Sequence, residues 1–323
     1  MRTFLGVDVG SSKTHALIAD EQGRCLGFGV SGAGNYQGVG YDGLAAALQA
    51  AVGPALRMAA LLPAEIAGAG FGVAGYDWPS DRPAHLRSID TLGLQCPLDI
   101  VNDAVNGLLA GTSHGWGVNV SAGSSNNCRG RDRAGREGRI VGNGAPFGEY
   151  GGAAEIVMKG LQAVNYAWIR RTPPTVLTSI FLEATGATDE MDLMEGLSFD
   201  RYHLSPILTR RIFEAAYAGD AAAAGIIRWA GEELGWLAVS VIRQLDMQDE
   251  AVEVIQSGSV FEGGVLLAEP MREVVVQHAP RAILKRLDGP PVVGAVLLGM
   301  ETAGFDGYAV RERMVREAAA LLP

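Results

Sequence analysis

The sequence of 323 residues is poor in cysteine, in basic charge and in long apolar runs. Its three cysteines, Cys25, Cys96 and Cys128, lie far apart and form no C-x-x-C pair, so we expect neither a disulfide framework nor a zinc site, and a reducing cytoplasm is the default location. The net charge of −10 argues against a nucleic-acid partner, which needs basic patches. No apolar run reaches the roughly 18 residues of a membrane span, and the N-terminus lacks a signal-peptide pattern.

Glycine, by contrast, is abundant. The 44 glycines are about twice the usual share of ~7%. They cluster at the ends of expected strands and in turns, as is common in α/β proteins that bind ligands. The length is sufficient for two domains of ordinary size.

The first chemically informative stretch is residues 4–20, FLGVDVGSSKTHALIAD. Two apolar runs flank a small polar turn, which predicts a β-hairpin. Burying Asp8 inside an apolar strand would cost stability, so we expect it at an open strand end. The tip, formed by Gly10, Ser11, Ser12 and Lys13, lets backbone N–H groups approach an anion, and Asp8 could hold hydrated Mg²⁺ beside a phosphate. The alternative is a plain surface hairpin.

The same pattern returns in the second third of the chain. GVDV–GSS at residues 6–12 is echoed by GVNV–GSS at 117–125, and DEQGR at 20–24 by DRAGR at 132–136. The spacing is too long for a repeat array and predicts two related halves. Two such tips, the second at Gly123, Ser124 and Ser125, suit a ligand with several phosphates, although G-S-S is simple enough to recur by chance.

Asp103 follows an apolar strand, residues 98–101, and begins a helix. Aspartate is a common N-cap, so capping is one interpretation. The other rests on position, because ligands bind at the C-terminal ends of strands in open α/β sheets. An aspartate there can orient and deprotonate a substrate hydroxyl, and phosphoryl transfer otherwise needs positioning and charge neutralisation.

Four further polar residues lie in loops after strands or glycine-rich turns: Asn35, Asp77, Asn127 and Glu149. Each fits an ordinary turn, but together they offer donors and acceptors for a polyhydroxylated ligand. A turn containing Gly258 and Ser259 and a second one at residues 293–295 could hold a flat ring such as adenine, or could simply allow close helix packing.

The remaining pattern predicts a more helical second half. We expect strands at 25–30, 66–73 and 252–256, and helices at 41–62, 82–92, 104–110, 153–170, 176–185, 191–197, 205–217, 220–245, 265–277, 290–300 and 308–322. A hinge is expected near residue 114.

In this order the motifs resemble the acetate kinase/sugar kinase/Hsp70/actin superfamily, and more narrowly the N-acetylglucosamine kinase branch of the BadF/BadG/BcrA/BcrD ATPases. GVDVGSSKTHALIAD resembles the first phosphate motif, VNDAVNGLLAGT the segment with the catalytic aspartate, and VSAGSSNNCRGRDRAGREGR the second phosphate motif. FGEYGGAAEIVMKG resembles the loop that follows, SGSVF the adenosine motif and PPVVGAVLLGM the closing helix.

The resemblance implies an α/β fold of two ribonuclease H-like, actin-like ATPase domains around a nucleotide cleft, with the C-terminal domain more helical. It implies domains at 1–114 and 115–306 and a final helix at 307–323 that packs back on the first domain. Asp103 would be the base, Asp8 would face Mg²⁺, and both hairpin tips with Gly258 and Ser259 would bind ATP. Asn35, Asp77, Asp103, Asn127 and Glu149 would contact the sugar.

The implied function is transfer of the γ-phosphate of ATP to the 6-hydroxyl of N-acetylglucosamine or a related hexosamine, by a cytoplasmic enzyme that is often a homodimer. Two loops depart from the family pattern, at 123–126 and 148–152, so a different amino sugar or a hexose stays open. The alternatives are an activating ATPase for a dehydratase or reductase, which would need paired cysteines, and a non-catalytic sugar or nucleotide sensor.

Overall fold

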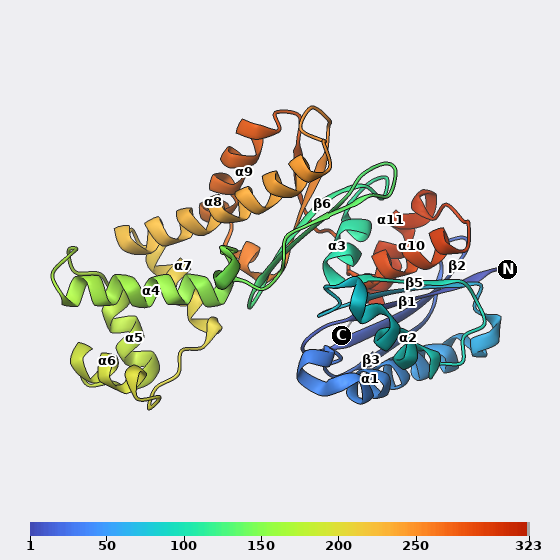
Figure 1. Cartoon of the computed structure of the whole chain (residues 1–323), viewed down its shortest axis with the longest axis horizontal. Helices are drawn as coiled ribbons and strands as arrows, with labels where there is room; N and C mark the ends of the chain where they lie inside the picture. Colours follow the sequence, from blue (N-terminus) through green and yellow to red (C-terminus); the bar gives the residue numbers. More distant parts are fainter. Residues whose placement is uncertain (322–323) are drawn as a thin grey trace.

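The computed structural model describes residues 1–321, which form two lobes that each contain a five-stranded sheet (Figure 1). The first sheet has the order β3-β2-β1-β4-β5. Its strands are β1 Thr3–Val9, β2 Thr14–Asp20, β3 Cys25–Ser31, β4 Gly68–Val73 and β5 Leu98–Asn102. The hairpin predicted for residues 4–20 is therefore present as β1 and β2.

The second sheet has the order β10-β9-β6-β7-β8. Its strands are β6 Gly117–Ala122, β7 Asn126–Arg131, β8 Glu137–Arg139, β9 Glu253–Ser257 and β10 Ile283–Arg286. In both sheets three antiparallel strands are followed by two parallel ones, β4 and β5 in the first and β9 and β10 in the second. The two halves thus share one topology.

The turn after each hairpin is built by the same hydrogen bonds. The Asp20 carboxylate accepts from the backbone N of Arg24 at 2.9 Å and from its Nε at 2.6 Å. The Asp132 carboxylate accepts from the backbone N of Arg136 at 2.8 Å and from its Nε at 2.6 Å. Chance recurrence of a simple string would not reproduce this geometry, so the duplication predicted from the sequence is structural.

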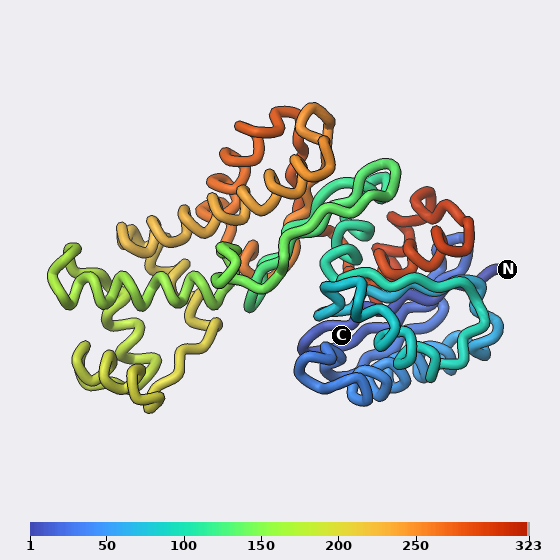
Figure 2. Tube along the Cα trace, in the orientation of Figure 1, coloured from blue at the N-terminus to red at the C-terminus, as the bar shows by residue number. Residues whose placement is uncertain are grey.

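Eleven α-helices are described. They are α1 Tyr36–Ala59, α2 Arg82–Asp90, α3 Asp103–Gly111, α4 Ala153–Trp168, α5 Leu177–Thr185, α6 Glu190–Ser198, α7 Thr209–Tyr217, α8 Ala221–Gln244, α9 Val265–His278, α10 Val292–Thr302 and α11 Arg311–Leu321. None within residues 1–321 is long and apolar enough to cross a bilayer. Helices α4–α9 and the second sheet form what we call the second lobe. Helix α8 packs on β6, β7 and β8, whereas α4–α7 extend away from the sheet (Figure 2).

The first lobe consists of the first sheet with α1, α2, α10 and α11 around it. Side chains on β1 alternate between two faces, as a strand requires. Leu5, Val7 and Val9 belong to the core under α1, whereas Phe4 belongs to a core with α10 and α11. Asp8 therefore lies on the same face of β1 as Phe4, the face that α10 covers. It stands near the end of the strand, where Asn106 on α3 reaches it. Its position at a strand end agrees with the sequence-based expectation.

Helix α10 packs across β1 and β4 because glycines remove the side chains that would hold it away. A Cβ on Gly6 would lie 2.3 Å from the backbone N of Val296, and one on Gly70 would lie 2.2 Å from the carbonyl oxygen of Ala295. Figure 1 shows α10 and α11 beside the strands of the first lobe. Helix α10 falls inside the predicted domain 115–306 but packs on the first sheet, and the proposed domain limits at 114 and 306 stay a prediction.

Several elements differ from the expectation. The helix predicted at 205–217 is a 3₁₀ turn, Pro206–Leu208, followed by α7. Helix α1 begins at Tyr36 rather than near residue 41, because the Asn35 side chain accepts from the N–H of Gln37 and caps it; the backbone kinks at Gly40. Strand β10 was not predicted, because its four residues form a half-exposed edge with little apolar character. The last predicted helix, 308–322, is a 3₁₀ turn followed by α11, and residue 322 lies outside the described residues.

Candidate active site

The C-terminal ends of the strands and the two hairpin tips meet around a polar cavity of about 280 Å³ between the lobes. Many of the predicted site residues line it: Ser11, Asn35, Asp77, Asp103, Gly123, Ser124, Ser125 and Asn127. These residues come from five separate segments of the chain. The cavity therefore unites most of the acceptor-site and second-tip residues, together with one residue of the first tip.

Asp103 is the first residue of α3, but it is not the N-cap. That position belongs to Asn102, whose side-chain oxygen accepts from the N–H of Ala104 at 3.0 Å. The capping interpretation of Asp103 is therefore wrong, because its neighbour performs that role. The Asp103 carboxylate is left at the cavity wall, where it can meet a substrate hydroxyl.

The environment of Asp103 favours its protonated form. Burial raises its pKa to about 7, and the negative charges of Asp8 and Asp77 also raise it. The backbone N–H of Ala104 and the guanidinium of Arg129 act in the opposite direction. A carboxyl with a pKa near neutrality is suited to general base catalysis, because it can take a proton and return it at the working pH.

Asp8 is the second carboxylate of the site. Burial raises its pKa to about 6, partly offset by a hydrogen bond of 2.8 Å that Asn106 Nδ2 donates to Asp8 Oδ1. The second oxygen has no cationic partner among the described residues. A divalent cation would relieve the mutual repulsion of Asp8 and Asp103, so the donor set fits Mg²⁺, which prefers oxygen ligands and keeps several waters.

No group of three or more His, Cys, Asp or Glu that could hold a metal occurs within residues 1–321. A magnesium ion at Asp8 would therefore need water and phosphate oxygens for the rest of its coordination shell, as is usual for ions that act on nucleotides.

A buried polar network joins the two lobes beneath the cavity. Asn102 Nδ2 donates to Asp77 Oδ1 at 3.0 Å, and Asn127 Nδ2 donates to Asn102 Oδ1 at 3.1 Å. Arg129 Nη2 donates to the same Asp77 oxygen at 2.9 Å. Burial raises the pKa of Asp77 even though Arg129 and Arg139 oppose that rise. Asp77 thus presents a carboxylate whose position is fixed by two donors.

On the other side of the cavity, Asn35 Nδ2 donates to Ser11 Oγ at 3.2 Å. This contact links the loop before α1 with the first hairpin tip. Ser11, Ser12 and Lys13 are exposed at that tip, and Ser124 and Ser125 are exposed at the second. Both tips present hydroxyl groups on the cavity side of the molecule, but Gly10, Ser12 and Lys13 do not line the cavity itself.

Glu149 has a different environment from the other predicted sugar contacts. Its carboxylate accepts from the backbone N–H groups of residues 141–144, at 2.6, 2.9, 2.9 and 3.1 Å. Both oxygens are engaged, and the side chain is buried. Glu149 therefore holds the loop whose Gly142 and Asn143 line the cavity, and its direct contact with a sugar stays a prediction.

Gly258 and Ser259 lie at the end of β9, behind the second tip. Gly258 has a φ of 94° and its missing Cβ would lie 2.3 Å from the carbonyl oxygen of Ala122, so a side chain would displace the strand that leads into Gly123. Ser259 lines a separate cavity of about 410 Å³, together with Phe213 and Tyr217. Its walls combine apolar and aromatic side chains, on which a flat ring can pack, with the charged side chains of Arg210, Glu214 and Glu262.

The second candidate turn for a flat ring, at residues 293–295, lies inside α10. A Cβ on Gly294 would lie 2.0 Å from the carbonyl oxygen of Asn106 on α3. Gly294 is therefore a helix-packing glycine, the alternative that the sequence left open.

Sequence reasoning missed three residues of the site: Asn102, Asn106 and Arg129. Asn102 had a usable signal, because it stands where the strand ends and the helix begins. Asn106 lies one helical turn after Asp103, a spacing that places it on the same side of α3. Arg129 had only a weak signal, a charge within the second hairpin, because its partner Asp77 is distant in sequence.

Two lobes of shared topology around a polar, acidic cavity define a two-domain ribonuclease H-like ATPase fold. Solved structures support this. The fold matches a candidate N-acetylglucosamine kinase from Chromobacterium violaceum with a TM-score of 0.69, 23% identity and coverage of 92% of this chain and 99% of that chain. It also matches a ROK family glucokinase from Streptomyces griseus, solved with glucose and AMPPNP, with a TM-score of 0.53, 20% identity and coverage of 98% and 99%.

The chain belongs to the BadF/BadG/BcrA/BcrD ATPase family, which it matches over residues 5–299. It is 25% identical over 300 residues to the N-acetylmuramic acid/N-acetylglucosamine kinase of Clostridium acetobutylicum, covering 92% of this chain and 98% of the relative. It is 27% identical over 316 residues to the N-acetyl-D-glucosamine kinase of Dictyostelium discoideum, covering 93% and 98%. The predicted family, fold and enzyme class, an ATP-dependent kinase, are confirmed.

Proposed function

We propose that this kinase transfers the γ-phosphate of ATP to the 6-hydroxyl of N-acetylglucosamine or a related hexosamine. The observation that carries the proposal is Asp103, whose carboxylate lines the cavity between the two hairpin tips with a pKa of about 7. A base at that place can take the proton of an alcohol while the tips hold the phosphates of ATP. The names of the two curated relatives support the sugar.

In this mechanism the acceptor binds side chains of both lobes. Asn35, Asp77 and Asn127 offer hydrogen bonds to its hydroxyl groups, and Asp103 accepts the proton of the attacking hydroxyl. The backbone and hydroxyl groups of residues 10–13 and 123–125 position the triphosphate, and the cavity at Ser259 receives the adenine ring. Magnesium, held by Asp8 with water and phosphate oxygens, would supply charge neutralisation on the phosphates.

A sugar panel tests the proposal. With ATP and Mg²⁺, ADP release should rise with N-acetylglucosamine and should be at least about tenfold weaker with N-acetylmuramic acid, as kcat/KM. The charged side chains that line the acceptor cavity are Asp77 and Asp103, and a carboxylate on the sugar would be repelled by them. Failure of every hexosamine and hexose to raise turnover above background would refute the proposal. Sugar binding without turnover would identify a sensor instead.

The pH dependence of the reaction follows from Asp103. Its pKa of about 7 is raised from 3.8, so in the free enzyme at pH 6 most of the base is protonated and inactive. We expect kcat/KM for the sugar to fall about tenfold per pH unit below the pKa and to level off above pH 8. Steady-state rates between pH 5 and pH 9 measure this. A kcat/KM that stays level from pH 9 down to pH 5 would mean that Asp103 is not the group that titrates.

We also propose the cytoplasmic location and the homodimer that the family resemblance implies. Analytical ultracentrifugation of the purified chain, with and without sugar, measures the oligomeric state directly.

A further inference from the structure

Strand β7 presents one row of side chains to the first lobe. Asn127, Arg129 and Arg131 are two residues apart and so share a face of the strand. Each bonds a first-lobe residue: Asn127 bonds Asn102, Arg129 bonds Asp77, and Arg131 bonds Glu301 on α10. The opposite face, with Cys128 and Gly130, packs in the core of the second lobe against α8. Strand β7 therefore carries a row of contacts from the second lobe to the first, beside those that Asn119 on β6 makes with Ala104 and Arg139 on β8 makes with Asp77.

Arg129 is the centre of this row and is 2% exposed. Its Nη2 donates to Asp77 at 2.9 Å and its Nη1 donates to Glu137 at 3.4 Å, while its Nε has no partner within the described residues. Burying a guanidinium with an unsatisfied N–H is costly. A packing role alone would be met by an apolar side chain at lower cost, as is often found for buried ion pairs.

The bonds of Arg129 lead to the catalytic base through two residues. Arg129 and Asn102 both donate to Asp77 Oδ1, and the other end of the Asn102 amide caps the helix that begins at Asp103. A displacement of Arg129 would therefore remove one of the two donors that fix the Asp77 carboxylate and loosen the cap that orients Asp103.

We infer that Arg129 is a positioning residue of the acceptor site: from the second lobe it fixes the Asp77 carboxylate and, through Asn102, the start of α3. The inference rests on the proposed function, because that function defines the acceptor as a sugar. The charged groups that face Asp103 are Asp8 on β1, Asp77 after β4 and Arg129 on β7. Arg129 is the one positive charge among these three, so its loss leaves two carboxylates against the base.

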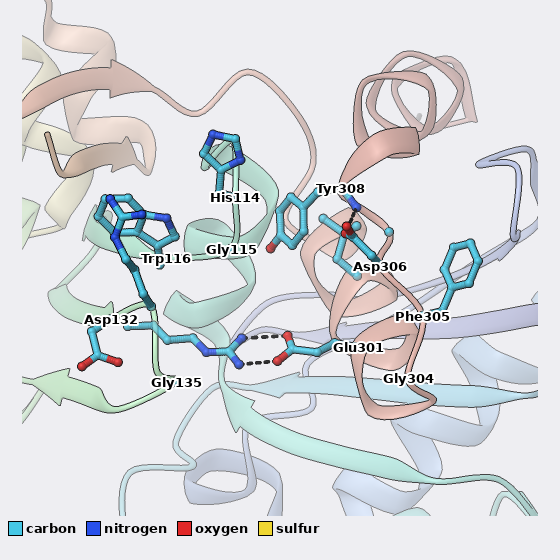
Figure 3. Close-up of a pocket in the computed structure, with 14 residues that line it drawn as sticks. His114, Gly115, Trp116, Asp132, Gly135, Glu301, Gly304, Phe305, Asp306 and Tyr308 are labelled. Atoms are coloured by element: carbon cyan, nitrogen blue, oxygen red, sulfur yellow. Dashed lines mark hydrogen bonds and ion pairs between the residues drawn. The ribbon is translucent and has the colours of Figure 1, made fainter.

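The test compares Arg129→Gln with Arg131→Gln, a matched change two residues along the same face. Arg131 pairs with Glu301 beside a cavity of about 440 Å³ that is separate from the acceptor cavity; Figure 3 shows the two contacts of Glu301 there. For Arg129→Gln we expect the apparent pKa of the acid limb in the pH profile of kcat/KM to rise by about 0.5–1 pH unit. The kcat/KM for sugar should fall roughly 10–100-fold, because the acceptor is misplaced. Arg131→Gln should match the wild type in both measurements.

The conservative variant Arg129→Lys separates charge from geometry. It keeps the positive charge, so the acid limb should stay near that of the wild type, but one ammonium cannot reproduce the guanidinium fork, so the KM for sugar should rise. If Arg129→Gln does not fold, this variant decides the matter, and an unchanged KM for sugar would overturn the inference. Equal pH profiles and KM values for Arg129→Gln and Arg131→Gln would also overturn it.

An NMR titration of the aspartate carboxyl carbons separates this inference from the proposed function, because it needs no turnover. If the wild type phosphorylates no sugar, the proposed function fails, but the Asp103 titration must still move upward in Arg129→Gln and stay in place in Arg131→Gln. An unmoved Asp103 titration in a folded Arg129→Gln protein would refute the positioning role whatever the substrate is.

Discussion

Replacing Asp103 by asparagine is expected to remove sugar-dependent turnover and, at the same time, to stabilise the fold. The amide cannot accept the proton of the hydroxyl, so kcat should fall roughly 10²–10⁴-fold, the usual contribution of a general base. ATP binding should persist, because the substitution leaves the proposed nucleotide site, formed by the hairpin tips and the cavity at Ser259, untouched. Isothermal calorimetry with an ATP analogue and a coupled ADP assay measure the two properties separately.

The gain in stability follows from the raised pKa. In the unfolded chain the carboxyl has its ordinary pKa of 3.8, and in the fold it is raised to about 7, so the folded state resists ionisation. The resulting penalty is absent below pH 4, grows as the pH rises and is complete above pH 7. We therefore expect Asp103→Asn to raise the free energy of unfolding by roughly 1–3 kcal/mol near pH 8 and to leave it unchanged near pH 4.

Asp132 provides a control of opposite sign. Its carboxylate lies in the turn of the second hairpin, where hydrogen bonds from Arg136 and backbone N–H groups lower its pKa. Asp132→Asn should therefore destabilise the fold at neutral pH and leave turnover unchanged. Urea denaturation at pH 4 and pH 8 compares both variants. If Asp103→Asn lost stability as Asp132→Asn does, Asp103 would be a structural residue and not a base.

The sequence was sufficient for the parts of the molecule that local pattern determines. The alternation of β1, its polar tip and the echo at residues 117–136 follow from period-two burial and from turn chemistry, both of which are readable along the chain. Asp103 was found because a strand end followed by a helix start marks the binding edge of an α/β sheet. These features involve neighbours in sequence.

What the sequence could not provide were contacts between distant segments. Arg129 and Asp77 are 52 residues apart, and nothing local to either predicts their ion pair. The Glu149 carboxylate is fully used by a loop only five to eight residues before it, yet whether it bonds that backbone or a sugar depends on how the loop curls. The packing of α10 on the first sheet depends on glycines in β1, β4 and α10 itself. Nothing in the sequence near any one of them indicates that these segments come into contact.

Another glycine of α10, Gly294, faces α3 and gives the second large expected effect. Gly294→Ala on α10 would place a methyl group 2.0 Å from the carbonyl oxygen of Asn106 and 2.9 Å from the backbone N of Ala110, both on α3. Backbone atoms cannot rotate away, so the helices must separate. We expect the free energy of unfolding to fall by about 1–3 kcal/mol or more, the cost of overpacking a core.

The same change should reach the chemistry, because α3 carries Asp103 at its start and Asn106 donates to Asp8. A shift of about 1 Å in a catalytic group can cost roughly 100-fold in rate, so kcat should fall 10–100-fold in the fraction that stays folded.

The matched control is Gly225→Ala in α8, where a new Cβ meets no atom within 4 Å. That variant should gain about 0.5–1 kcal/mol from helix propensity and keep its rate. Thermal unfolding and kcat of the two variants decide the point: a Gly294→Ala protein as stable and as active as Gly225→Ala would mean that the close contact of α10 with α3 does not hold the base in place.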